Sequence, residues 1–270
     1  DMMGYDFSFI DRKDTDCLKF DFTRERGHRD DCLSYWVADM DFKTAPEILE
    51  SVHERVNHGI FGYTNIKDHY YETVAPWMKR HHGYEVRREW LIETPGVVFA
   101  LATAIKAYSK AGDAVLIQTP VYYPFKNVVL KNDRRLVTSP LVWEKDGGGF
   151  GNYSVDYDDF ESKIVENNVK LFLLCNPHNP GGKSWKKEEL SKIAEICLRY
   201  NVIVVSDEIH SDFVWKPNTH TVFASLSKDV EKITVTCTSP SKSFNLAGLQ
   251  VSNIFVADEK LRKAFWLERD

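Results

Sequence analysis

The sequence lacks the glycine-rich signatures of the common nucleotide sites. No G-x-G-x-x-G run follows an early apolar segment, and no G-x-x-x-x-G-K-[ST] run is present. We therefore predict neither a dinucleotide site nor a P-loop. A G-x-S-x-G run is missing as well, which argues against a serine hydrolase of the α/β type.

Long apolar runs and an excess of one charge are also lacking. No run approaches the roughly 18 apolar residues of a membrane-spanning helix. The 35 Lys and Arg and the 40 Asp and Glu are intermixed, and the net charge is −5. Without a basic stripe or a basic amphipathic helix, we expect no nucleic-acid partner and no membrane partner.

Cysteines are few and form no C-x-x-C pair. There are five, an odd number, at positions 17, 32, 175, 197 and 237. Such scattered residues are typical of reduced thiols, so we expect a cytoplasmic protein without a metal site. The stretch DMMGYDFSFIDRKD at residues 1–14 is acidic and poor in apolar residues, and it does not resemble a signal peptide.

The composition is that of a globular protein. The 270 residues are 43% hydrophobic, enough for one large domain or two smaller ones. From about residue 90 onward, short β-rich apolar runs alternate with helical patterns. Residues 186–199 carry apolar side chains at helical spacing. The apolar runs are residues 114–117, 171–175, 202–205, 233–236 and 254–256. This alternation predicts an α/β fold with a mostly parallel sheet covered on both faces.

Polar clusters follow four of these runs. They are QTPVYYPF, NPHNPGG, SDEIHSD and CTSPSKSF. In open α/β sheets, ligands bind at the edge formed by the carboxyl ends of the strands. Each cluster alone is also typical of an ordinary turn rich in Pro, Asn, Asp and Ser. Four clusters of different chemistry at one edge favour a ligand site.

The clusters contain the groups that pyridoxal phosphate requires. Lys242 supplies an amine, Asp207 an anion, Asn179 an amide, and Tyr122 and Tyr123 aromatic rings. The cofactor's aldehyde needs an amine, and its ring nitrogen needs an anionic partner to stay protonated. An aromatic side chain can cover its flat face.

A phosphate-binding site is predicted at Gly96. In the stretch TPGVVFALATAIKAY, Gly96 precedes a helical pattern that runs to Tyr108. The free N–H groups at a helix start attract phosphate, and glycine lets it approach closely. Taken alone, this stretch is also typical of a plain Pro-Gly turn before a helix.

Several motifs together resemble the fold-type I pyridoxal-phosphate enzymes of the class I/II aminotransferase superfamily. Within them the chain is most similar to the MalY/PatB group of cystathionine β-lyases and cysteine desulfhydrases, which includes cystalysin. The motifs occur in order along nearly the whole chain and are WVADMDF, GYT, TPGVV, TPVYYPF, NPHNPGG, SDEIHSD and SPSKSFNLAGLQ.

The resemblance implies a role for each matching residue. Lys242 would form a Schiff base with pyridoxal phosphate and act as the acid and base, while Asp207 would pair with the ring nitrogen. Asn179 and His210 would contact the ring oxygen, although His210 also fits a structural histidine in a helix after Asp207. Tyr122 would stack on the ring, and Tyr123 would lie near the substrate or be a core aromatic.

The remaining implied contacts concern the phosphate and the substrate. Tyr63 would reach the phosphate of a neighbouring subunit, which makes the site a property of a homodimer. WVADMDF places two residues near the substrate carboxylate, or packs the N-terminal arm. The phosphate-binding residues implied are Gly96, Val97, Ser239 and Ser241, and the substrate-binding residues are Ala38 and Asp39.

Two departures from the superfamily pattern stand out. Gln250 occupies a position where many members have a phosphate-binding arginine. The β-lyase group often lacks this arginine. The 270 residues also hold no counterpart of the C-terminal arginine that grips the substrate α-carboxylate. We expect residues 1–44 to form an N-terminal arm of a small domain and residues 45–270 to form the large cofactor-binding domain. The C-terminal part of the small domain is expected to be missing.

The resemblance implies a carbon–sulfur β-lyase. The reaction would be α,β-elimination from cystathionine or cysteine, giving a thiol, pyruvate and ammonia. An aminotransferase is the first alternative, because it shares the cofactor and the first steps. A regulatory protein that retains the fold is the second, although the paired Lys242 and Asp207 argue against lost catalysis.

Overall fold

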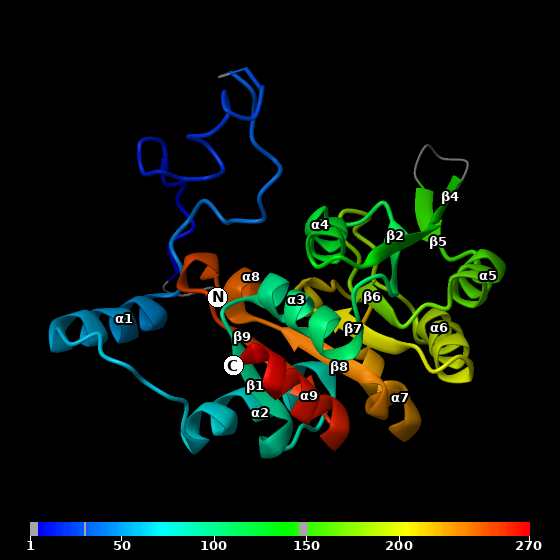
Figure 1. Cartoon of the computed structure of the whole chain (residues 1–270). Coiled ribbons are helices and arrows are strands. Elements are labelled where there is room, and N and C mark those ends of the chain that lie inside the picture. Colours follow the sequence, from blue (N-terminus) through cyan, green and yellow to red (C-terminus); the bar gives the residue numbers. More distant parts are fainter. Residues whose placement is uncertain (1–4, 30, 146–150) are drawn as a thin grey trace. The chain divides into compact units, whose positions relative to one another are not determined.

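The computed structural model describes residues 5–29, 31–145 and 151–270 (Figure 1). By internal contacts the chain divides into two units. The first comprises Asp1–Asn65 and Pro240–Leu249, and the second comprises Ile66–Ser239 and Gln250–Asp270. These limits differ from the predicted arm at residues 1–44, and the predicted domain boundaries stay a prediction.

The second unit is built on a seven-stranded sheet of order β1-β9-β8-β7-β6-β2-β3. Five neighbouring strands, β3, β2, β6, β7 and β8, are parallel, while β9 and β1 are antiparallel to their neighbours. The strands are β1 (Leu91–Thr94), β2 (Ala114–Thr119), β3 (Arg135–Pro140), β6 (Leu171–Cys175), β7 (Ile203–Asp207), β8 (Thr234–Thr238) and β9 (Ser252–Val256).

The predicted mostly parallel α/β sheet is therefore confirmed. All five apolar runs form strands, and the predicted helix at residues 186–199 is α6 (Lys187–Arg199). β9 runs antiparallel because a parallel crossover needs a long connection. Within residues 239–251 the helices are only α8 (Pro240–Ser243) and the 3-10 turn η4 (Ala247–Leu249).

Helices cover both faces of the sheet. The other helices of the second unit are α2 (Asp68–His82), α3 (Val97–Tyr108), α4 (Pro124–Lys131), α5 (Tyr157–Asn167), α7 (Lys228–Lys232) and α9 (Glu259–Arg269). Short 3-10 turns are η1 (Arg88–Trp90), η2 (Ser211–Phe213) and η3 (Phe223–Leu226), and β4 (Val142–Lys145) pairs with β5 (Gly151–Ser154) in a hairpin.

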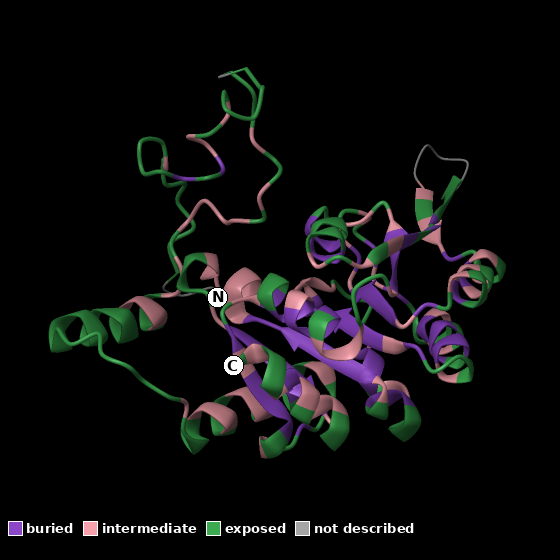
Figure 2. Cartoon of the chain, viewed as in Figure 1, coloured by how far each residue is buried: buried purple, intermediate pink, exposed green. Residues whose placement is uncertain are grey.

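The core lies on the two faces of this sheet. Alternate residues of each strand enter different clusters, so that Val205 packs with α3 residues such as Leu101, and Val204 packs with α6 residues such as Ile193. Figure 2 shows the central strands buried. The strands β6, β8 and β9 are buried at every position, as expected for strands covered on both faces.

The first unit has a different character. It holds α1 (Pro46–His58), α8, η4 and the irregular segment before residue 46. No residue of α1 is buried, and Figure 2 shows this helix without a buried face. Among the described residues of the unit, only Cys17 and Lys19 are buried.

Candidate functional site

The carboxyl ends of the parallel strands carry the predicted polar clusters, and hydrogen bonds join neighbouring clusters. Tyr122 N donates to Asn179 O at 2.9 Å, which links the loop after β2 to the loop after β6. His178 Nε2, 2.7 Å from Pro120 O, donates a second bond between the same loops. Asn176 N donates to Asp207 O at 2.9 Å and ties the loop after β6 to the end of β7.

Asp207 is the last residue of β7 and is only 5% exposed. Cys175 and Cys237 are its register partners on β6 and β8. Burial raises the pKa of both thiols, and the charge of Asp207 raises them further. The carboxylate therefore lies between two neutral thiols in a setting of low polarity, where its charge acts strongly on a nearby group.

Cys175 has a second contact that the sequence did not suggest. Asn179 N donates to Cys175 Sγ at 3.2 Å, so the buried thiol helps to hold the loop that carries the predicted amide. Asn179 itself is partly exposed. Cysteine is common in cores as a small apolar residue, so its type alone carried no signal of this role.

Tyr122 and Tyr123 lie at the start of α4, with ring centroids 5.4 Å apart. Burial raises the pKa of Tyr122, and the charges of Tyr123 and Asp207 add to this. The phenol of Tyr122 is therefore neutral near pH 7. Tyr122 is 37% exposed and Tyr123 is 58% exposed, so the alternative of a core aromatic at Tyr123 is wrong.

His210 lies in a turn that leads into η2, and not in a longer helix as the alternative supposed. Its ring packs edge-on against Phe213, with centroids 6.2 Å apart. The histidine is partly exposed. His210 therefore lies three residues after Asp207, beyond the carboxyl end of β7.

The start of α3 has the features of an anion site. Gly96 precedes the helix with a φ of 107°, a backbone conformation that suits glycine, and no side chain caps the helix. Val97 begins the helix and is buried. A Cβ added at Gly96 would stand 3.5 Å from Gln250 Oε1, which places the neutral amide of Gln250 beside this helix start.

The serines after β8 divide between the two units. Ser239 belongs to the second unit, and its hydroxyl donates to Val251 O at 2.7 Å. Ser241 belongs to the first unit, where Leu246 N donates to its carbonyl at 2.9 Å. Their predicted contacts with phosphate stay predictions.

Lys242 lies on α8 in the first unit, four residues after the end of β8 in sequence. Its Nζ is 3.5 Å from Ala38 O, so the structure brings these two predicted residues together. Asn245 holds the same segment, because it accepts from Met40 N at 3.1 Å and donates to Phe42 O at 3.2 Å. The motif WVADMDF therefore packs beside the lysine-bearing turn.

A pocket of about 470 Å³ opens within the first unit, lined by Arg12, Asp39, Asp41 and Asn245 among others. Arg12 pairs with Asp39 at 3.1 Å and with Asp41 at 3.4 Å, and Lys19 pairs with Asp41 at 2.6 Å. Sequence reasoning missed Arg12 because no motif contains it. Its partner Asp39 stays a predicted substrate residue.

Tyr63, the predicted contact to a neighbouring subunit, is fully exposed in the segment between α1 and α2. Exposed apolar side chains accompany it at Ile60 and Phe61. Within the described chain, this segment thus covers no core.

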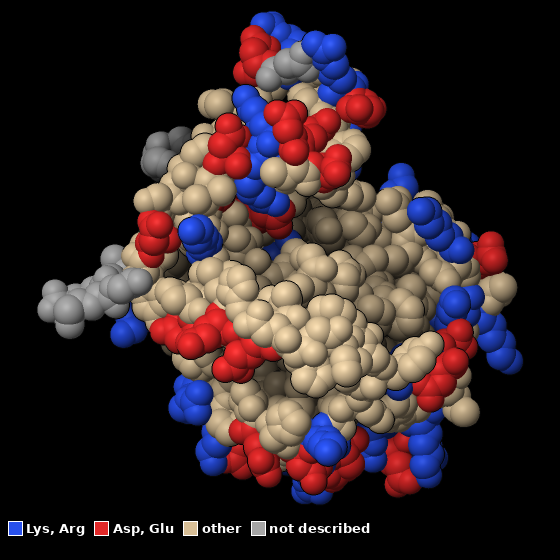
Figure 3. Space-filling view, turned by 90° about the vertical axis from the view of Figure 1, so that its left-hand side faces the viewer, with Lys and Arg blue, Asp and Glu red and all other residues tan. Residues whose placement is uncertain are grey.

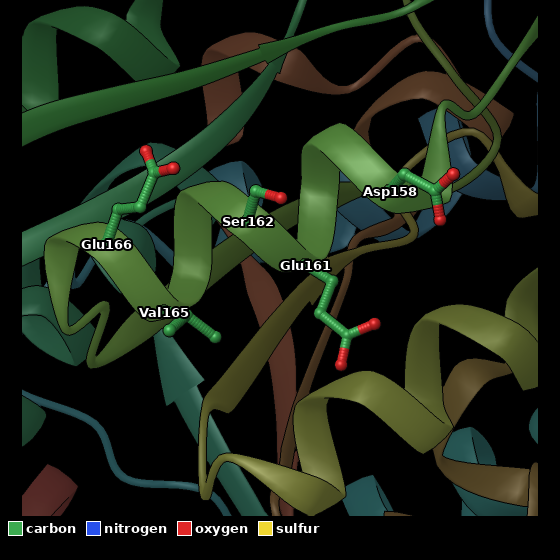
Figure 4. A pocket seen from close by; sticks show the side chains of 5 residues that line it. All are labelled: Asp158, Glu161, Ser162, Val165 and Glu166. Atoms are coloured by element: carbon green, nitrogen blue, oxygen red, sulfur yellow. The ribbon is translucent and has the colours of Figure 1, made fainter.

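A second pocket, of about 420 Å³, lies on α5 and is lined by five of its residues. Figure 4 shows their side chains on one stretch of the helix, with Glu161 directed away from Glu166. Glu161 is already bound by Arg199 and by Tyr200 Oη, the latter at 2.8 Å. This pocket is an acidic helix surface without a candidate catalytic group.

The described residues also bear on charge distribution, metal-ligating groups and membrane-spanning helices. On the face in Figure 3, acidic and basic atoms are interspersed without a continuous field of one sign. The described residues form no His, Cys, Asp and Glu group suited to a metal ion. No helix among them is long and apolar enough to cross a membrane.

The fold and this arrangement agree with the family comparison. The model of the family "Aminotransferase class I and II" matches residues 35–265, and the chain belongs to this family. The predicted class, an α/β fold of the fold-type I pyridoxal-phosphate enzymes with a mostly parallel sheet, is confirmed.

Individual relatives show which group within this family the chain resembles. Cystathionine beta-lyase PatB of Bacillus subtilis is 47% identical over 94% of this chain, and Protein MalY of Escherichia coli is 33% identical over 97%. The chain spans 65% of the length of each. Cystalysin of Treponema denticola, whose crystal structure contains pyridoxal 5'-phosphate, matches 99% of this chain and 68% of its own, with a TM-score of 0.92 and 38% identity. The predicted resemblance to the MalY/PatB group is therefore confirmed.

Proposed function

We propose that the protein is a pyridoxal-phosphate-dependent carbon–sulfur β-lyase. Its substrate would be cystathionine or cysteine, and its products a thiol, pyruvate and ammonia. The main support is Asp207, a buried carboxylate at the carboxyl end of β7, in a chain 47% identical to a cystathionine β-lyase. The family alone does not select elimination, since aminotransferases belong to it as well.

The residues of each unit fit the cofactor. The uncapped start of α3 after Gly96 offers backbone N–H groups to a phosphate, and the positive φ keeps that position free of a side chain. Asp207 offers an anion to a ring nitrogen, and Asn179 offers an amide to a ring oxygen. We assign the phosphate to Gly96, Val97, Ser239 and Ser241, and the ring to Asp207, Asn179, His210 and Tyr122.

When bound, pyridoxal phosphate supplies a protonated ring that accepts the electrons left at the substrate Cα. Asp207 keeps the ring nitrogen protonated, because an anion in a setting of low polarity stabilises a nearby cation. Tyr122 covers the flat face of the ring. These residues bind and orient the group on which the reaction depends.

Proton movement falls to Lys242. Its amine takes the proton from the substrate Cα and so acts as the general base. Ala38 and Asp39 would lie near the substrate carboxylate, and Tyr123 would lie close to the substrate. The C–S bond at Cβ then breaks with its electron pair on sulfur, and the remaining three-carbon unit is hydrolysed to pyruvate and ammonia.

A product assay tests this function. The protein is loaded with pyridoxal phosphate and given cystathionine or cysteine without any keto acid. We expect pyruvate and ammonia over many turnovers, together with little conversion of alanine when a keto acid is added. A reaction that stops after one equivalent and restarts only with a keto acid would mean an aminotransferase.

The regulatory alternative has its own test. A protein that only binds a partner would show no turnover with any sulfur amino acid, yet it would capture its partner equally well as wild type and as Lys242→Ala. Turnover that disappears in Lys242→Ala would exclude that alternative.

We further propose a homodimer. Exposed apolar side chains on and after α1, at Val56, Ile60, Phe61 and Tyr63, support an interface on the first unit. Large exposed apolar patches commonly mark association sites. Sedimentation should give twice the mass of the chain, and Tyr63→Ala should weaken cofactor binding without changing the fold of the second unit.

The compartment and the domain division complete the proposal. All five cysteines are free, which supports the reducing cytoplasm. We keep residues 1–44 as the arm of a small domain and residues 45–270 as the large domain. Limited proteolysis tests this division, and a stable core that began well after residue 45 would contradict it.

A further inference from the structure

The turn after β7 carries two kinds of residue. Asp207 and His210 are the predicted cofactor contacts, and Glu208 and Asp212 alternate with them along the chain. Both of these carboxylates pair with histidines from other parts of the second unit. The turn is therefore held by two histidines that lie outside the motifs of the cofactor assignment.

Glu208 is the more deeply buried of the two, with 1% of its surface exposed. Its Oε1 accepts from Ser206 Oγ at 2.8 Å and from Phe223 N at 3.0 Å. Its Oε2 lies 2.7 Å from His220 Nε2, which donates to the carboxylate. Three donors, one in β7 and two within residues 220–223, thus hold the residue that directly follows Asp207.

The second pair holds the other end of the turn. His82 Nε2 lies 2.8 Å from Asp212 Oδ1, and His82 is the last residue of α2. The rings of His82 and His220 pack edge to face, with centroids 5.4 Å apart. The two histidines therefore connect the two carboxylates into one continuous group beneath the turn.

Strand geometry separates this group from the cofactor edge. Along β7, successive side chains point to opposite faces. Val204 packs in one core cluster and Val205 in the other. Ser206 and Glu208 continue the face of Val204, and Asp207 continues the face of Val205. The bonds of Glu208 thus hold the backbone of Asp207 without competing for its carboxylate.

The energetics favour a positioning role over a purely stabilising one. Burying a carboxylate is unfavourable, and replacing a buried polar pair by apolar residues of equal volume is often neutral or stabilising. A fully hydrogen-bonded network does, however, restrict a backbone to one geometry. The turn needs such restriction if Asp207 and His210 are to meet a flat ring.

We propose that Glu208–His220 and Asp212–His82 are positioning pairs that hold the turn of residues 207–213, and with it Asp207 and His210, in the orientation that binds the cofactor. The inference rests on the proposed function. It assigns no contact with the cofactor to any of the four residues.

The first test compares Glu208→Gln with Glu231→Gln in the whole chain. Glu231 is also a buried carboxylate, but it pairs with Lys228 on the same helix. Outer partners that orient the ligands of a metal commonly contribute about ten- to a hundredfold in affinity or activity, and we take the lower end of that range for partners that orient Asp207. We expect Glu208→Gln to weaken pyridoxal-phosphate binding about tenfold and to shift the visible absorbance of the bound form, and Glu231→Gln to do neither. Equal effects of both variants, or none from Glu208→Gln, would overturn the proposal.

A double-mutant cycle distinguishes positioning from general damage. In an Asp207→Asn background, Glu208→Gln should cost much less affinity than in wild type, because it acts through the same group. An undiminished loss would mean that Glu208 acts independently of Asp207. If Glu208→Gln does not fold, His82→Gln replaces it in this cycle, because the His82–Asp212 pair is the more exposed of the two.

Hydrogen exchange tests whether the pairs hold the turn without relying on cofactor binding or turnover. In the cofactor-free protein, amides of residues 208–213 should exchange faster in Glu208→Gln than in wild type, while Glu231→Gln leaves them unchanged. A wild type that takes up no pyridoxal phosphate would refute the proposed function, and the exchange rates would then decide the inference. Unchanged rates in Glu208→Gln would refute it.

Discussion

The two units of the chain differ in how they are stabilised. The second unit encloses large side chains such as Phe160 and Phe172 completely, on both faces of a seven-stranded sheet. The first unit leaves Leu33 81% exposed and Tyr35 90% exposed, and it is organised by ion pairs and the bonds of Asn245. Burial of large apolar side chains contributes more to the free energy of unfolding than a few partly exposed ion pairs do.

The residues of the proposed site are also divided between the two units. The groups assigned to the ring belong to the well-packed second unit, whereas Lys242, Ser241, Tyr63, Ala38 and Asp39 belong to the first. The second unit can therefore position its groups by its own core. The first unit has little core of its own, and its exposed apolar side chains are consistent with the proposed subunit interface.

The largest expected effect comes from Lys242 of the first unit. Lys242→Ala should abolish turnover and the visible absorbance band of the bound cofactor, because the proposed proton transfer loses its base. The free energy of unfolding should not change, since the side chain lies outside the core of the second unit. An unaltered spectrum together with wild-type turnover would remove Lys242 from the mechanism.

A pair of substitutions to alanine tests the difference in packing. Phe172→Ala should lower the free energy of unfolding by about 3–5 kcal/mol, because a fully buried ring leaves a cavity. Phe9→Ala, at an exposed ring of the first unit, should change it by no more than about 0.5 kcal/mol. Urea denaturation of wild type and both variants at one protein concentration measures both losses. Similar losses would mean that Phe9 also belongs to a cooperative core.

Asp207→Asn tests the anion of the second unit. The amide is nearly isosteric but cannot hold a ring nitrogen protonated, so we expect turnover to fall by about 10²–10³. The fold should persist, which circular dichroism and the unfolding midpoint can verify. A loss smaller than tenfold would place the anionic partner elsewhere.

The smallest expected effect concerns pH. Burial lowers the pKa of His178 below its ordinary value of 6.5, so the folded protein keeps this ring neutral while the unfolded chain takes up a proton. Its stabilising contribution is thus complete above about pH 6.5 and is lost as the pH falls below that value. Thermal unfolding at about pH 7.5 and about pH 5.5 should show a smaller pH dependence for His178→Gln than for wild type. Equal dependence in both would contradict the assignment.

The sequence alone was enough to predict the central layer of this fold. Strands β2, β6 and β7 begin with continuous apolar runs, and β8 alternates threonine with apolar residues, because both faces of a parallel sheet are covered. The polar clusters follow them directly, so their place at one edge could be predicted as well. The start of α3 was predictable for a similar local reason, since Gly96 stands just before a helical apolar period.

Only the tertiary structure decided what distant segments do to one another. The strands β1 and β3 were not predicted, because β1 is short and β3 alternates between buried and more exposed residues. The antiparallel direction of β9 depends on where the connection from β8 returns to the sheet. Glu208 meets His220, and Arg12 meets Asp39, across intervening chain that no local period describes. Local propensity reaches a few residues along the chain, whereas these pairs depend on the register of the sheet and on how the loops pack.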